Sequence, residues 1–153
     1  MVLLTKVLVA LARALQVTIY TDKLPPAAGG AANAFVVRIR PKYRGDAGIH
    51  AHEAVHVAQF WAVSALACVA LSVACHLAQQ PPVYAVLGFA THSLLYALVP
   101  AYRLWAEVQA YSEQLRHYPD DRTELFAEYI AQGYRLDISP AQATDQLRRA
   151  SNA

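Results

Sequence analysis

The stretch HEAVH at residues 52–56, followed by Gln59, decides how this chain is organised. On a helix, residues four apart lie on one face, so His52 and His56 can offer two imidazole nitrogens to one metal ion. Glu53 lies about 100° round the helix, where its carboxylate can take a proton from a metal-bound water. Converging neutral ligands on a rigid helix, with a carboxylate beside an open coordination position, are what a catalytic zinc site requires. We therefore predict Zn²⁺ as the cofactor, with His52 and His56 as ligands and Glu53 as the general base.

The composition narrows the class of protein. The chain has 153 residues, enough for one hydrophobic core, so we predict a single domain over residues 1–153. Its net charge is +2 and its 13 Lys and Arg residues are scattered, which argues against a nucleic-acid partner. The hydrophobic fraction of 56% exceeds the roughly 45–50% of soluble domains. Much of the apolar excess falls between Ala54 and Tyr102, where there is no Asp, Glu, Lys or Arg.

The domain divides into three predicted parts. Residues 1–33 comprise an amphipathic helix over residues 1–20, packed on the domain or on a membrane surface, and a connector interrupted by Pro and Gly pairs. Residues 34–114 form the metal-site core. Residues 115–153 form C-terminal helices, one of them capped at Ser139 before a proline.

A short strand precedes the metal-binding helix. Residues 35–40, Phe-Val-Val-Arg-Ile-Arg, are rich in β-branched side chains and alternate in their second half, which predicts a strand. Asp46 lies in the loop that follows, and we expect it to cap a helix that begins near Gly48.

That helix is unusually long and apolar. It meets no stop signal between Gly48 and the turn at residues 79–82, Gln-Gln-Pro-Pro. A second charge-free run covers residues 83–102, where Gly88 and Pro100 can bend the helix without ending it. The two runs predict a helical hairpin.

The hydrophobic hairpin, residues 57–105, has two interpretations. Each run has about 20 residues, the length that crosses the hydrocarbon core, and Trp61 and Trp105 lie together at its open end like an aromatic belt. In a membrane hairpin the positive-inside rule places both ends and the active site on the cytoplasmic side, because the tip carries no Lys or Arg. In the other interpretation the remaining helices bury the hairpin in a soluble cytoplasmic or phage-particle-associated protein, which His76 and His92 within the runs favour. The sequence leaves both open.

The hairpin indicates where to find a third metal ligand. A catalytic zinc normally has three protein ligands. Counted from the turn, His56 is about 25 residues back and Glu107 about 25 residues forward, so antiparallel helices rising 1.5 Å per residue place them at the same height. Glu107 is also the first carboxylate after the charge-free run. We therefore predict Glu107 as the third ligand.

Four more residues are candidates for supporting roles. Gln59 shares the face of the two histidines, so we expect either a hydrogen bond to a ligand or a packing contact with the second helix. An oxyanion formed during hydrolysis needs a hydrogen-bond donor. Arg103, Tyr111 and His117 are the candidate donors.

These motifs resemble the zincins with a glutamate ligand, the gluzincins. The HExxH, a charge-free helical hairpin and then Glu107 resemble the membrane-embedded HtpX-type peptidases, in which two hydrophobic segments separate HExxH from a Glu ligand. The chain is also similar to small phage and prophage metallopeptidases, which place a short strand and a Gly-containing loop before HExxHxxQ. The match covers residues 34–114. Tyr111 stands where the larger membrane peptidases carry Asp, a departure at a supporting position.

The resemblance implies a fold and an activity. The fold is expected to be mainly α, a minimal zincin-like domain with the hydrophobic hairpin and one short β-strand or hairpin before the active-site helix. The activity is expected to be zinc-dependent hydrolysis of a peptide or protein, whose extended chain pairs with Val37, Arg38 and Ile39. The alternative is a structural or interaction protein, phage- or membrane-associated, that keeps the scaffold with weak or no catalysis. The sequence predicts no oligomeric state.

Overall fold

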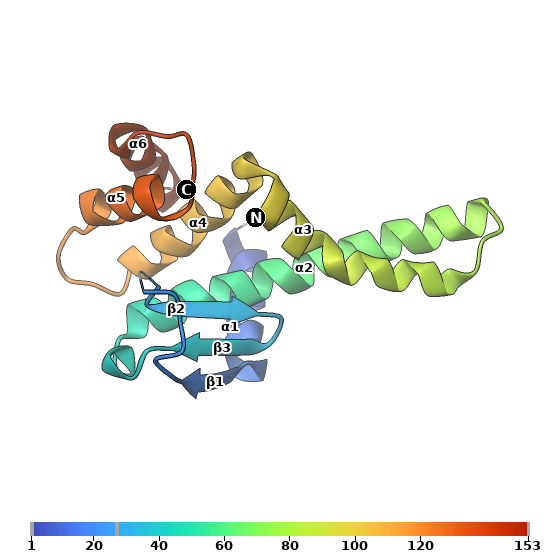
Figure 1. The fold of residues 1–153 in the computed structure, drawn as a ribbon, viewed down its shortest axis with the longest axis horizontal. Helices are drawn as coiled ribbons and strands as arrows, with labels where there is room; N and C mark the ends of the chain where they lie inside the picture. The colour runs from blue at the N-terminus through green and yellow to red at the C-terminus, as the bar shows by residue number, and fades with distance from the viewer. Residues whose placement is uncertain (1, 27, 153) are drawn as a thin grey trace.

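The computed structural model describes residues 2–26 and 28–152, and within them the chain is mainly helical. A long helical hairpin projects from a head that holds the sheet and the other helices (Figure 1). The predicted fold class, mainly α with a long hydrophobic hairpin, is confirmed. Residues 1, 27 and 153, which the single-domain prediction also covers, lie outside the described residues.

Helix α2, Ala47–Leu77, carries the HEAVH stretch of residues 52–56 and forms the outgoing arm of the hairpin. Asp46 caps it as predicted: its carboxylate accepts hydrogen bonds from the backbone N–H groups of Gly48 and Ile49, at 2.9 and 3.1 Å. The hydroxyl of Tyr118 donates to the same carboxylate at 2.8 Å. A Cβ at position 48 would lie 2.5 Å from that hydroxyl, so glycine is required here. These contacts fix the first turn of the helix that carries the histidines.

The returning arm is not one straight helix. It begins as a 3₁₀-helix, η2, Pro82–Ala90, and continues as α3, Thr91–Leu98. The chain then bends by 95° into α4, Pro100–Leu115. Pro100 lacks an N–H group and disfavours helical geometry at Val99, which is extended with φ −112° and ψ 99°. The sequence allows a bend at Pro100, but the second helix was predicted to continue through it, whereas the structure breaks it at Val99 and α4 leaves the hairpin direction.

Three short strands form one sheet in the order β1-β3-β2. Strands β1, Val17–Tyr20, and β3, Val36–Ile39, are parallel, and β2, Gly30–Asn33, is antiparallel to β3. The predicted strand before α2 is confirmed, as the second half of the β2–β3 hairpin. The helix predicted over residues 1–20 is shorter: α1, Val2–Leu15, ends before β1, whose β-branched and aromatic residues favour a strand. The predicted connector likewise ends early, because its last four residues form β2.

The sheet packs on α1 and α2. Val37 and Ile39 of β3 are fully buried there. They belong to one hydrophobic cluster with Val9 of α1 and Val55 of α2. The Arg40 guanidinium holds the connector in front of β2: it donates to the carbonyls of Ala28, Leu24 and Pro25, at 2.8, 3.2 and 2.8 Å respectively. β2 is thereby held beside the first turns of α2 (Figure 1).

The C-terminal helices cover α4. Helix α5, Thr123–Gly133, and helix α6, Pro140–Ser151, bury Phe126, Ile130 and Leu147 against α4. Ser139 caps α6 as predicted, in a capping box with Gln142.

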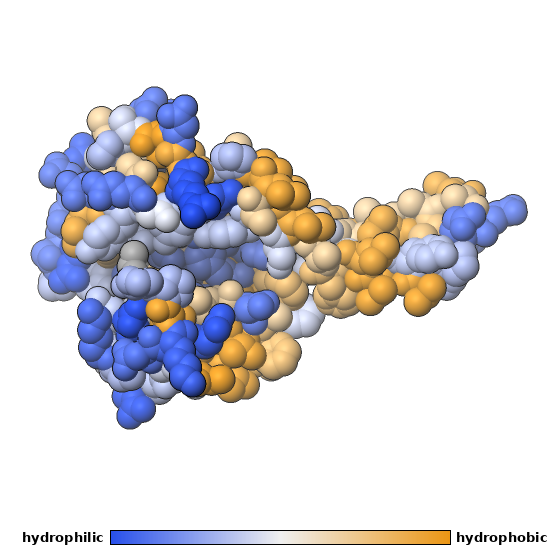
Figure 2. Space-filling model, in the orientation of Figure 1, coloured by the Kyte–Doolittle hydropathy of each residue, from blue (hydrophilic) through white to orange (hydrophobic). Residues whose placement is uncertain are grey.

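The hairpin arms expose apolar side chains beyond the head. Helix α2 is long and apolar enough to cross a membrane, and only 11% of its apolar 18-residue window is buried. In Figure 2 the hairpin is hydrophobic along its length and hydrophilic at its tip. Within the described residues, the other helices leave most of the hairpin uncovered, which differs from the burial expected in the second interpretation. The exposed side chains include Leu66, Val69, Val73, Leu77, Val83, Val86 and Leu87.

Candidate metal centre

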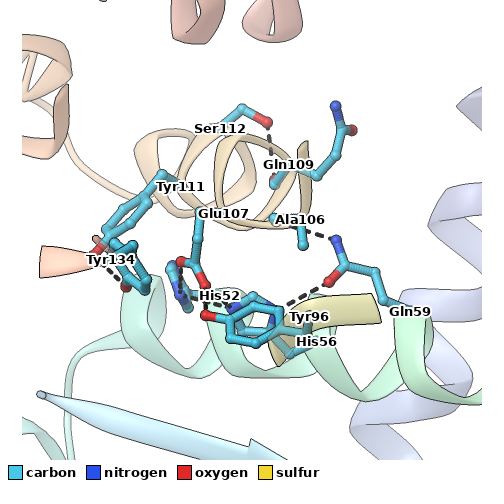
Figure 3. A network of polar contacts seen from close by, with 10 residues as sticks. All are labelled: His52, His56, Gln59, Tyr96, Ala106, Glu107, Gln109, Tyr111, Ser112 and Tyr134. Carbon is cyan, nitrogen blue, oxygen red and sulfur yellow. Dashed lines mark hydrogen bonds and ion pairs between the residues drawn. The ribbon is translucent and has the colours of Figure 1, made fainter. Parts of the chain in front are cut away.

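The structure brings His52, His56 and Glu107 together, as the sequence predicts, in a group that can hold a metal ion. The two Nε2 atoms of His52 and His56 are 3.1 Å apart. Glu107 Oε2 lies 3.6 Å from His52 Nε2, and Glu107 Oε1 lies 3.4 Å from His56 Nε2. A tetrahedral zinc with bonds of about 2.0–2.1 Å separates its ligand atoms by about 3.3 Å. The three distances, of which the two to Glu107 are measured to its two different oxygens, are close to this separation (Figure 3).

Gln59 sets the tautomer of His56. Its Nε2 donates to the backbone carbonyl of Ala106 at 3.1 Å, and that carbonyl can only accept. The Gln59 Oε1 therefore faces His56 Nδ1, at 3.0 Å, and the Nδ1 atom carries the hydrogen. His56 Nε2 is then the atom that a metal would use. Of the two alternatives expected for Gln59, the structure has both the hydrogen bond and the contact with the second helix.

Charges within the centre are coupled. Burial, and then the neighbouring His56, lower the pKa of His52 to about 3, so its imidazole is neutral at neutral pH. Burial also opposes a charge on His56, but the Glu107 carboxylate outweighs it and raises the pKa of His56. The pKa of Glu107 is held low by His56, against the effect of its own burial. Without a metal, His56 and Glu107 therefore form a buried ion pair.

Glu53 is buried beside the ligands and against strand β2. A Cβ at position 30 would overlap the Glu53 carboxylate, with Cδ at only 2.9 Å, so Gly30 lets the side chain fit. Burial raises the pKa of Glu53 to about 7, with His56 opposing the rise and Glu107 adding to it. Among the described residues, neither Glu53 Oε2 nor Glu107 Oε2 has a hydrogen-bond partner. Unpaired buried carboxylate oxygens are rare in proteins, and they fit a site that takes a cation or a proton.

A cleft of about 380 Å³ opens over these groups. One wall is β2, and the other is the root of the hairpin, with Phe60, His92 and Tyr96. Tyr134, from the segment after α5, also lines the cleft. The head in Figure 2 is hollowed between the lobe of α4–α6 and the lobe of the sheet. The metal group thus lies where an elongated ligand can reach it.

Two of the predicted oxyanion donors, Arg103 and His117, make other contacts. The Arg103 guanidinium donates to the carbonyls of Tyr96, Ala97 and Tyr134, each at 2.8 Å. All three of its nitrogens are therefore engaged with backbone oxygens. His117 Nε2 lies near Arg13 and Glu113, at 3.3 and 3.8 Å, and does not line the cleft. The structure thus supports neither as an oxyanion donor.

Tyr111 supports His52 from the side. Its ring packs edge-on against the imidazole, with centroids 4.4 Å apart. Its hydroxyl contacts the Tyr134 hydroxyl at 3.0 Å. Of these two tyrosines, Tyr134 lines the cleft.

The strand predicted to bind substrate, β3, is not the edge strand that borders the cleft. Val37, Arg38 and Ile39 lie on β3, which pairs with β1 on one side and with β2 on the other. No edge of β3 is left for a peptide, and Val37 and Ile39 are fully buried, whereas Arg38 lines the cleft. The edge strand beside the cleft is β2.

Sequence reasoning missed the residues that the hairpin contributes to the site. His92 and Tyr96 lie four apart on α3, and both line the cleft. A polar pair at this spacing in an apolar run is a signal that was available. Comparison with protein-family models, with curated proteins and with solved structures finds no match in any of the three.

Proposed function

We propose that this chain is a zinc-dependent metallopeptidase. The observation that carries the proposal is the close group of His52, His56 and Glu107, whose facing nitrogen and oxygen atoms are 3.1–3.6 Å apart, beside the buried carboxylate of Glu53. Structural zinc sites are closed by four protein ligands, whereas catalytic sites have three and an accessible position. The group found among the described residues has three ligands and adjoins a cleft, which supports a catalytic site.

The residues present fit the chemistry of peptide hydrolysis. Zn²⁺ held by His52, His56 and Glu107 would supply a Lewis acid, which would lower the pKa of a bound water toward about 7 and would polarise the substrate carbonyl. Glu53 takes one proton from the attacking water as the C–O bond forms, and passes it to the amine nitrogen as the C–N bond breaks. Its raised pKa, about 7, suits both directions of transfer near neutral pH. The Tyr134 hydroxyl lines the cleft and is the candidate donor to the oxyanion.

The substrate class follows from the edge strand. Among the residues that the structure describes, β2 pairs with β3 on one side only, and its other edge lies along the cleft. An extended peptide can pair with such an edge through backbone hydrogen bonds, while its side chains alternate between the two sides. The small residues of β2, Gly30-Ala31-Ala32, leave room for a chain to approach the Glu53 carboxylate.

The decisive experiment compares two substitutions in the purified full chain. His56→Ala is expected to lose stoichiometric zinc, and Glu53→Gln is expected to keep zinc and lose cleavage of a fluorogenic peptide library. Zinc binding without any cleavage by the unsubstituted chain would favour the alternative, a scaffold that serves a structural or interaction role.

We further propose that the hairpin inserts in a membrane and holds the site at its cytoplasmic surface. Residues 60–77 rise about 27 Å along α2, close to the roughly 30 Å of the hydrocarbon core. Trp61 and Trp105 are exposed near the root of the hairpin, where aromatic side chains favour the interface. Every Lys and Arg lies outside residues 54–102, which puts both ends on the cytoplasmic side by the positive-inside rule.

Helix α1 offers a second apolar surface. Val7, Leu11 and Leu15 are exposed and lie four residues apart, so they form one stripe. Such a stripe suits a helix lying in the membrane interface. Flotation of the chain with liposomes tests the membrane proposal independently of catalysis.

A further inference from the structure

Tyr96 touches the metal centre from the returning arm of the hairpin. Its hydroxyl donates a hydrogen bond to Glu107 Oε1, the oxygen that also faces His56 Nε2 at 3.4 Å (Figure 3). Its ring stands edge-on to the His56 imidazole, with centroids 6.2 Å apart and planes at 84°. Tyr96 therefore contacts one predicted ligand by its hydroxyl and packs beside another by its ring.

The helix that carries Glu107 also holds the backbone of Tyr96. Arg103, one turn before Glu107 on α4, donates to the Tyr96 carbonyl at 2.8 Å and to the Ala97 carbonyl at 2.8 Å. Its guanidinium lies 5.8 Å from the centre of the Tyr96 ring. These carbonyls are in the last turn of α3, where they lack intrahelical partners. Arg103 therefore fixes Tyr96 on the far side of the bend at Pro100.

We propose that Tyr96 is a positioning residue of the metal centre, which orients the Glu107 carboxylate and thereby sets metal affinity. A carboxylate ligand can rotate and offer either oxygen. The Tyr96 hydroxyl occupies Oε1, whereas Oε2, 3.6 Å from His52 Nε2, has no hydrogen-bond partner among the described residues. Hydrogen bonds of this kind to metal ligands typically change metal affinity 10–100-fold.

The inference links the hairpin to the metal. Tyr96 lies on α3, the head end of the returning arm, so the hydroxyl reaches Glu107 only when that arm is packed against α4. By thermodynamic linkage, a metal that binds the oriented carboxylate must in turn stabilise the packed arm. The inference rests on the metal-binding part of the proposed function and not on catalysis.

The test measures zinc affinity by chelator competition in the detergent-solubilised full chain. Tyr96→Phe removes only the hydroxyl and is expected to weaken zinc binding about 10–100-fold. Tyr84→Phe removes the same atom from an exposed position on the same arm and is expected to leave zinc affinity unchanged. The visible spectrum of bound Co²⁺ is expected to change in Tyr96→Phe alone, because it reports ligand geometry. Equal zinc affinity and equal Co²⁺ spectra in both variants would overturn the inference.

A second measurement needs no substitution. Zinc is expected to slow hydrogen exchange in α3 of the unsubstituted chain and to leave exchange in α6 unchanged. Exchange in α3 that ignores zinc, in a chain that binds it, would refute the link while the proposed metal site survived. A chain that binds no zinc at all would refute the proposed function itself.

Discussion

Gly30 on β2 lies directly against the carboxylate of Glu53 on α2, so closely that no Cβ could occupy position 30 without moving it. The contact joins the edge strand of the sheet to the carboxylate beside the metal ligands. It also explains why a glycine stands in a strand, where it otherwise weakens pairing. The position of the proposed base therefore depends on a residue that carries no side chain.

The first prediction concerns this contact. Gly30→Ala is expected to push the Glu53 side chain aside at little cost in stability, because that side chain is flexible and can move. Displacing a catalytic group by about 1 Å can lower activity about 10²-fold. We expect peptide cleavage to fall by this order while zinc content and melting temperature stay near those of the unsubstituted chain. Gly45→Ala is the control, because a Cβ there meets no described atom within 4 Å. An active Gly30→Ala chain would contradict the assignment of Glu53.

The second prediction separates base from ligand. Glu53→Gln keeps the shape of the side chain but cannot accept the proton, so we expect cleavage to fall about 10²–10⁴-fold with zinc retained. Glu113→Gln is the matched control, because Glu113 lies on α4 in an ion pair with Arg116 and does not line the cleft. It should change neither zinc content nor cleavage. Zinc content is measured by atomic absorption and cleavage by fluorescence. Loss of zinc in Glu53→Gln would make Glu53 a ligand rather than the base.

The third prediction concerns pH. The pKa of His56 is raised from 6.5 to about 9, so its charge stabilises the metal-free chain below pH 6.5, and this contribution is lost as pH rises through about 9. The pKa of Glu107 is lowered from 4.5 to about 2, so its contribution is present above pH 4.5 and is lost as pH falls through about 2. Zinc must displace the proton on His56, so zinc affinity is expected to weaken as pH falls, by about tenfold per pH unit near neutrality.

Calorimetry in buffers of different ionisation enthalpy measures this directly. We expect about one proton to be released per zinc bound near pH 7.5. Binding without proton release would show that no His56–Glu107 ion pair precedes the metal.

The sequence correctly predicted that His52, His56 and Glu107 lie together, but by a path that the chain does not follow. Glu107 was placed level with His56 by counting a rise of 1.5 Å per residue along two antiparallel α-helices. The chain instead returns as a 3₁₀-helix, which rises about 2.0 Å per residue, and then bends by 95° at Pro100. The prediction held because Glu107 is the first carboxylate that α4 can offer after the bend. The bend angle itself depends on packing between α3 and α4, including the Arg103 contacts, and no local signal encodes it.

The strands show where local patterns fail. Val17–Tyr20 continues the apolar run of α1, and a short apolar run does not separate helix from strand. Gly30–Asn33, with two alanines, has poor strand propensity, so only its pairing with β3 makes it a strand. Because the sequence left open whether β3 belongs to a hairpin and did not predict β1, β3 was expected to be an exposed edge, although it is the central strand.

The final prediction concerns the hairpin. Val69 and Val73 lie four apart on α2 and are 62% and 55% exposed, so aspartate at both positions costs little in the folded chain in water. Within a bilayer, each charge costs about 2.5–3.5 kcal/mol. We expect the unsubstituted chain to float with liposomes in a density gradient, and Val69→Asp with Val73→Asp to remain in the dense fractions. Leu125→Asp with Tyr129→Asp, which adds the same charge at exposed apolar positions of α5 in the head, is the control and should float. If both double variants float equally, the hairpin does not enter the bilayer, and its apolar surface must contact something else.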